Sequence, residues 1–114
     1  MFYKIVEDYA DIIHGYSVSE FKRYDNASSL VASIEFIDQS ILYIKDYLFL
    51  DGSRKYSFHW QAHNGNLISR WDNSPHHKEI TTFPHHCHLP GKIENSQKRN
   101  LEDIVEFIAK ELRK

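Results

Sequence analysis

The sequence predicts an α+β protein: an antiparallel sheet of about five strands with an N-terminal helix before it and a C-terminal helix after it. Three observations predict this class. Apolar residues recur at helical spacing near both ends of the chain, apolar and polar residues alternate in its middle, and turn signals such as Asp51-Gly52 and Asn64-Gly65 separate the alternating stretches. A chain of 114 residues with 41% hydrophobic content can build one core, so we expect a single domain over residues 1–114.

Both terminal helices are predicted from apolar stripes. The first stripe consists of Ile5, Val6, Tyr9, Ile12 and Ile13, and Gly15 is expected to end this helix. The last stripe consists of Leu101, Ile104, Val105, Ile108 and Leu112. Asn100 precedes it as a good N-cap, and acidic residues follow in the first turn, where the helix dipole favours them.

Strands are expected over residues 18–24, 30–37, 41–50, 55–62 and 67–72. The Asn64-Gly65 dipeptide favours a two-residue hairpin loop in which His63 faces Asn66. In this register the core face pairs Phe58 with Trp71, Trp60 with Ser69 and Ala62 with Leu67. The opposite face pairs His59 with Arg70 and Ser57 with Asp72, and a one-residue slip would separate the two tryptophans.

Five of the eight histidines lie within thirteen residues, at positions 76, 77, 85, 86 and 88. Imidazole changes charge near neutral pH and is the commonest metal ligand, so this segment is where we expect the functional site. Pro75 and Pro84 stiffen the backbone before each histidine pair. If residues 85–88 are extended, His86 and His88 point to one side, and His85 and Cys87 point to the other.

An imidazole, a permanent cation and a carboxylate on one sheet face suit acid–base chemistry on a phosphodiester. The candidate catalytic residues are His59, Arg70, Asp72, His76, His77, His85, His86 and His88. The candidate substrate-binding residues are Tyr56, Trp71 and Asn73. In the proposed roles two histidines act as base and acid, Arg70 stabilises the transition state, and Asp72 orients a histidine.

Three other interpretations stay open. In the first, the polar residues form a solvated sheet face with a weak ion pair. In the second, the His86-x-His88 spacing near Asp72 holds a metal ion. This spacing matches no closed zinc motif, so our main expectation is that the protein has no metal ion and no cofactor. The histidines could instead order a surface that binds a protein target without catalysis.

Composition narrows the class of protein. A formal net charge of -2 argues against bulk binding of nucleic acid. The single cysteine, Cys87, allows no internal disulfide and fits a reducing cytoplasm. No apolar run is long enough for a membrane span, and the first residues do not read as a signal peptide. We therefore expect a cytoplasmic protein that does not associate with membranes.

Two runs of residues carry a family resemblance: Arg70-Trp71-Asp72-Asn73-Ser74-Pro75-His76-His77, and then Thr82-Phe83-Pro84-His85-His86-Cys87-His88. In these runs the chain resembles the TumE family of toxin components of toxin–antitoxin pairs. The stretch Tyr56-Ser57-Phe58-His59-Trp60 is similar to an aromatic strand of that family, and the resemblance covers nearly the whole chain. It implies a type II toxin neutralised by a co-encoded helix-turn-helix antitoxin. By analogy with other small toxins, it also suggests a RelE-like architecture and a ribonuclease. The histidine pairs beside Arg70 and Asp72 favour a metal-independent endoribonuclease.

Overall fold

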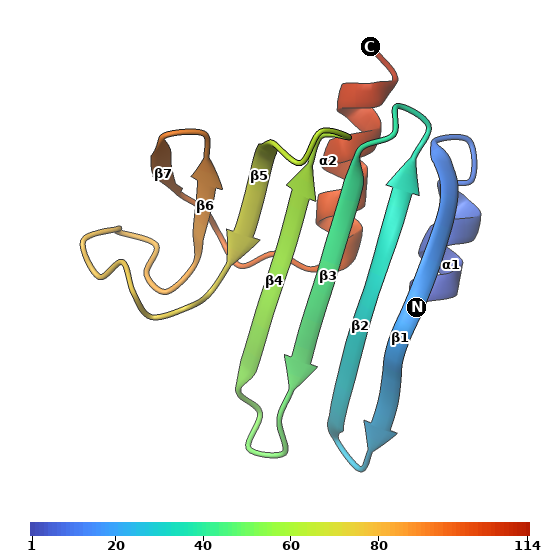
Figure 1. Ribbon diagram of the computed structural model, residues 1–114. Coiled ribbons are helices and arrows are strands. Elements are labelled where there is room, and N and C mark those ends of the chain that lie inside the picture. The colour runs from blue at the N-terminus through green and yellow to red at the C-terminus, as the bar shows by residue number, and fades with distance from the viewer.

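The computed structural model describes residues 1–114 and contains two helices and one seven-stranded sheet (Figure 1). In chain order the elements are α1 (Phe2–Asp8), β1 (Ile13–Tyr24), β2 (Ala27–Phe36), β3 (Ile41–Leu48), β4 (Arg54–Gln61), β5 (Leu67–Asp72), β6 (His86–Leu89), β7 (Lys92–Asn95) and α2 (Leu101–Leu112). Each strand pairs antiparallel with the next strand in the sequence, so the sheet is a continuous meander. The predicted α+β class is confirmed.

Both helices lie on the same side of the sheet, α1 behind its β1 edge and α2 behind its centre (Figure 1). The core fills the space between them and the covered sheet face. Asn100 begins α2 with a capping box, accepting a hydrogen bond from the Asp103 N–H and donating its own N–H to the Asp103 carboxylate, both at 3.0 Å. The other face of the sheet carries no helix and is called here the open face.

The sheet has seven strands, so the expected count of about five is wrong. The two additional strands, β6 and β7, form a short hairpin that turns at Pro90-Gly91, where Gly91 has φ 77°. Each has only four residues, and polar side chains on both strands hide the alternation that marks a longer strand. The histidine-rich segment therefore ends in the sheet, and the RelE-like architecture stays a prediction.

The first helix is shorter than predicted and ends at Asp8. Ile12 and Ile13 belong to the entry into β1, where the Ile12 carbonyl accepts a hydrogen bond from the Ile37 N–H at 2.9 Å. Gly15 lies inside β1 beside a register shift and does not end the helix. The spacing of the isoleucines fits a helical stripe, but two neighbouring isoleucines also suit the start of a strand.

The predicted β4–β5 register is confirmed from Ser57–Asp72 to Trp60–Ser69 and is wrong at the turn. A register shift after Trp60 pairs Gln61 with Leu67, and the Ala62 N–H donates to the Asn66 carbonyl. The loop is therefore one residue longer than predicted. Gly65 adopts φ 91°, as a three-residue loop with a glycine bulge requires.

Candidate functional site

Pairing across four strands places polar side chains on the open face in two rows, one residue from each strand β3 to β6. The first row is Tyr43, His59, Arg70 and His88. The second row is Lys45, Ser57, Asp72 and His86. Residues from widely separated parts of the sequence are thus neighbours on one surface, because each hydrogen-bonded pair of strands fixes which residues face each other.

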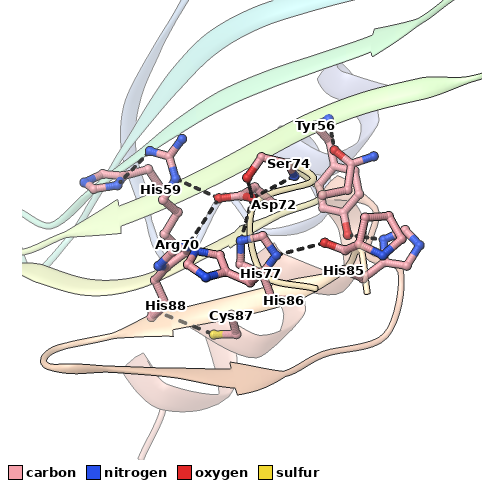
Figure 2. Close-up of polar contacts among 12 residues, drawn as sticks. Tyr56, His59, Arg70, Asp72, Ser74, His77, His85, His86, Cys87 and His88 are labelled. Carbon is pink, nitrogen blue, oxygen red and sulfur yellow. Dashed lines mark hydrogen bonds and ion pairs between the residues drawn. The ribbon is translucent and has the colours of Figure 1, made fainter. Parts of the chain in front are cut away.

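Asp72 lies at the centre of this site (Figure 2). Its exposed fraction is 5%. Its Oδ1 accepts hydrogen bonds from the Ser74 backbone N–H at 3.0 Å and the Ser74 hydroxyl at 2.9 Å. Its Oδ2 accepts one from Arg70 Nε at 3.0 Å. Burial favours the neutral acid, but the hydrogen bonds from Ser74 and Arg70 more than offset it, so the pKa of Asp72 is lowered.

Two histidines of β6 also face Asp72. Nε2 of His86 lies 2.8 Å from Oδ1, and Nε2 of His88 lies 3.5 Å from Oδ2. The side chain of His86 is only 1% exposed, and its Nδ1 donates a hydrogen bond to the Pro84 carbonyl at 2.8 Å. Its Nε2 is buried without an aligned hydrogen bond. His86 is therefore held in one orientation, with its Nε2 directed at a carboxylate.

The segment between β5 and β6, residues 73–85, brings His77 to the same place. The His77 ring centroid lies 5.0 Å from that of His86 and 5.5 Å from that of His88. One ring nitrogen from each of the three residues lies within 4.8 Å of the other two. We call these three residues the histidine cluster. The side chains of His77 and His88 are each 26% exposed, so solvent reaches the cluster from outside.

Arg70 separates two imidazoles on the open face. His59 donates from Nε2 to Gln61 Oε1 at 3.1 Å, and its Nδ1 lies 3.5 Å from Nη1 of Arg70. Burial lowers the pKa of His59, and the nearby guanidinium lowers it further. Burial also lowers the pKa of His88, with Asp72 acting in the opposite direction. The side chain of Arg70 is 41% exposed, so an anion can reach it.

Two hollows on the open face meet at Arg70. One of about 340 Å³ is lined by Tyr43, Lys45, Ser57, His59 and Arg70. The other, of about 270 Å³, is lined by Lys45, Tyr47, Lys55, Tyr56, Ser57 and Arg70. A larger hollow of about 410 Å³ lies on the other side of the molecule beside Met1 and Phe21, but it contains no histidine. The larger hollow also has basic residues in its lining, but only the hollows beside Arg70 combine cations with an imidazole, that of His59, so they are the better candidate for acid–base chemistry on an anionic ligand.

The structure places five of the predicted site residues outside the open-face site around Asp72. Trp71 is buried against Phe107 of α2 with ring centroids 5.5 Å apart, so its faces are covered. The Tyr56 hydroxyl is hydrogen-bonded to His85 Nδ1 at 2.9 Å, at the end of the core. The prediction that His85 and His86 point to opposite sides is thus confirmed by their different partners.

The remaining two of these five residues have no contact with the histidine cluster. The Asn73 amide accepts from the Tyr56 N–H at 2.9 Å and donates to the Arg54 carbonyl at 2.7 Å, so it holds the start of β4 in place. His76 is exposed on the segment between β5 and β6. The structure brings together His59, Arg70, Asp72, His77, His86 and His88.

Sequence reasoning did not single out Lys45, Tyr43 or Ser74. The alternation of Tyr43, Lys45 and Tyr47 in a predicted strand was a usable signal, because these positions share one face. A second signal was the repeated Asp-x-Ser pattern at 38–40, 51–53 and 72–74. In all three copies the serine N–H and hydroxyl donate to the aspartate.

Fold and site together define a small α+β protein with a polar site of arginine, histidine and aspartate on an uncovered sheet face. A family model described as Toxin TumE matches residues 2–113, and the chain belongs to this family. Membership suggests the toxin of a toxin–antitoxin system and implies an antitoxin partner. No curated protein and no solved structure matches the chain. Neither of its two helices has the length and apolar character that crossing a membrane requires.

Proposed function

We propose that this toxin cleaves RNA on its open face, with the scissile phosphate bound at Arg70. The observation that carries the proposal is the row in which His59, Arg70 and His88 stand on three neighbouring strands. Strands lie about 4.8 Å apart, so the backbones of the two histidines are about 10 Å apart with the guanidinium between them. A phosphate on Arg70 would therefore have an imidazole on either side.

This arrangement suits a metal-independent reaction that uses the substrate's own nucleophile. One imidazole takes the proton from the ribose 2′-hydroxyl, whose oxygen attacks phosphorus. The bond from phosphorus to the 5′-oxygen breaks, and the other imidazole donates a proton to that oxygen. The products are a 2′,3′-cyclic phosphate and a free 5′-hydroxyl. Arg70 stabilises the additional negative charge in the transition state, and Asp72 positions the guanidinium and His88.

The rest of the RNA is proposed to follow the two hollows toward β3. Lys45 and Lys55 are exposed there and offer cations to neighbouring phosphates. Tyr43 is 43% exposed and lies beside His59, with ring centroids 6.3 Å apart, so it offers an aromatic face to an unpaired base. This local basic and aromatic surface suits single-stranded RNA, even though the net charge of the chain is -2.

Residues 1–114 are proposed to act as one toxin domain, because the helices and the sheet share one core cluster. We also propose that the antitoxin is the co-encoded helix-turn-helix protein and that the toxin acts in the cytoplasm, where RNA and antitoxin are both present. Co-expression with the neighbouring gene product and recovery of a stable complex tests the partner. Recovery of the toxin alone would contradict it.

The cleavage assay uses untagged protein, a defined RNA and EDTA. We expect products ending in 2′,3′-cyclic phosphate, and loss of about 10²- to 10⁴-fold in rate for His59→Ala and Arg70→Ala. His63→Ala, on the exposed turn after β4, is the matched control and should retain the rate. Cleavage of an all-deoxy substrate, or an Arg70→Ala variant that cleaves normally, would contradict the mechanism. Growth arrest by folded Arg70→Ala protein would favour a non-enzymatic toxin.

A further inference from the structure

We propose that the histidine cluster, His77, His86 and His88, binds one divalent transition metal ion of the zinc class. One nitrogen from each ring already lies within 4.8 Å of the other two. Two of the ligands come from alternate residues of β6, and the third comes from the preceding segment, which passes over the same face. The proposal concerns metal binding and does not depend on the cleavage of RNA.

The strongest support is the buried nitrogen of His86. The Pro84 carbonyl can only accept a hydrogen bond, so Nδ1 of His86 carries a hydrogen. In the neutral ring, Nε2 then has a lone pair that faces the Asp72 carboxylate at 2.8 Å in a 1% exposed position. Two electron-rich atoms at this distance repel each other unless a positive charge lies between or beside them. A proton or a metal ion can supply that charge.

The surroundings favour a metal ion, because two more imidazoles converge on the same point. Nδ1 of His77 lies 3.4 Å from Oε1 of Glu79, which leaves its Nε2 free to coordinate. Ligating histidines usually donate the second ring N–H to a carboxylate or a backbone carbonyl, as His77 and His86 both can here. Nε2 of His88 lies 3.5 Å from Asp72, whose negative charge favours a cation beside it.

The donor set determines the class of ion. Three imidazoles suit zinc, copper, nickel or cobalt, whereas magnesium and calcium require oxygen ligands. Zinc–nitrogen bonds of about 2.0–2.1 Å place tetrahedral ligand nitrogens about 3.4 Å apart. The three ring nitrogens lie within 4.8 Å of one another, so they would approach by at most about 1.4 Å. His77 lies in the segment between β5 and β6, outside the regular strands, where such a movement is easiest. Three protein ligands leave a fourth position for water on the side that solvent reaches.

The test is direct binding of Zn²⁺ to untagged protein that has been stripped with EDTA and dialysed. Isothermal titration should show one Zn²⁺ per chain, and the melting temperature should rise when the ion is added. Co²⁺ in place of Zn²⁺ should give the visible absorption of a nitrogen-coordinated ion. His77→Ala should weaken Zn²⁺ binding by at least about tenfold, while His76→Ala, at the neighbouring exposed position, should leave it unchanged.

His77 lies outside the core, so its replacement should keep the melting temperature of the metal-free protein, and a loss of binding would then be a loss of a ligand. Absence of Zn²⁺ binding by the wild type would overturn the proposal and leave a proton between His86 and Asp72. Equal loss from His76→Ala and His77→Ala would also overturn it, because adventitious binding by surface histidines would explain both. Neither result depends on RNA, so failure of the metal proposal can be distinguished from failure of the cleavage mechanism.

Discussion

Replacement of Asp72 by asparagine tests whether the buried carboxylate holds the open-face site together. Asp72→Asn keeps an oxygen for the two hydrogen bonds from Ser74. It removes the negative charge and places an amide hydrogen donor where Oδ2 now accepts from Arg70 Nε at 3.0 Å. It also removes the charge that lies 2.8 Å from the buried Nε2 of His86.

The expected loss of stability follows from these contacts. A hydrogen bond to a charged group contributes about 1.5–3 kcal/mol. Removal of one partner of a fully buried ion pair costs about 3–5 kcal/mol, but Arg70 is 41% exposed and can turn toward water. We therefore expect the free energy of unfolding of the metal-free protein to fall by about 2–4 kcal/mol. For a chain of this length that lowers the melting temperature by about 8–16 °C.

Asp51→Asn is the matched control. Asp51 accepts the same two hydrogen bonds, from Ser53, in an exposed turn without arginine or histidine contacts. Its replacement should cost less than about 1 kcal/mol, because only two exposed local bonds lose their charge assistance. Urea denaturation in EDTA at pH 7 measures both variants. If the two variants lose the same amount, the contacts of Asp72 with Arg70 and His86 contribute nothing to stability, and the reasoning fails.

Three further predictions concern single groups. Adding Zn²⁺ to the EDTA-treated protein should slow RNA cleavage, because the ion occupies the lone pair of His88; cleavage that requires Zn²⁺ would contradict the metal-independent route. The pKa of His59, measured by NMR of its ring protons, should lie below its ordinary value of 6.5 because of burial and Arg70. Arg70→Gln should raise that pKa, and an unchanged value would show that the guanidinium does not act on the ring. Burial raises the pKa of Cys87 from 9.0 to about 11, so at pH 8 iodoacetamide should label it about 100-fold more slowly than a free thiol. Mass spectrometry measures the rate, and labelling as fast in the native protein as in urea would contradict this expectation.

Local patterns predicted those parts of the fold that depend on neighbouring residues. Periodicity and turn chemistry over short stretches predict the apolar stripe and N-cap of α2, the five longer strands and the Phe58–Trp71 pairing. The predicted end of the first helix is too late in the sequence, because Ile12 and Ile13 fit a helical stripe and a strand equally well. The same alternation that predicted the core face also indicated that Trp71 would be buried and unable to contact a substrate.

Local sequence establishes which residue types gather at positions 70–88 and that His86 and His88 share one side of an extended segment. The folded chain adds the pairing of β6 with β5, which places His88 beside Arg70 and His86 beside Asp72. The position of His77 against these two rings also depends on the path of residues 73–85. The pairing of β5 with β6 and the packing of the segment that joins them both depend on contacts between distant residues. Local periodicity carries no information about those contacts.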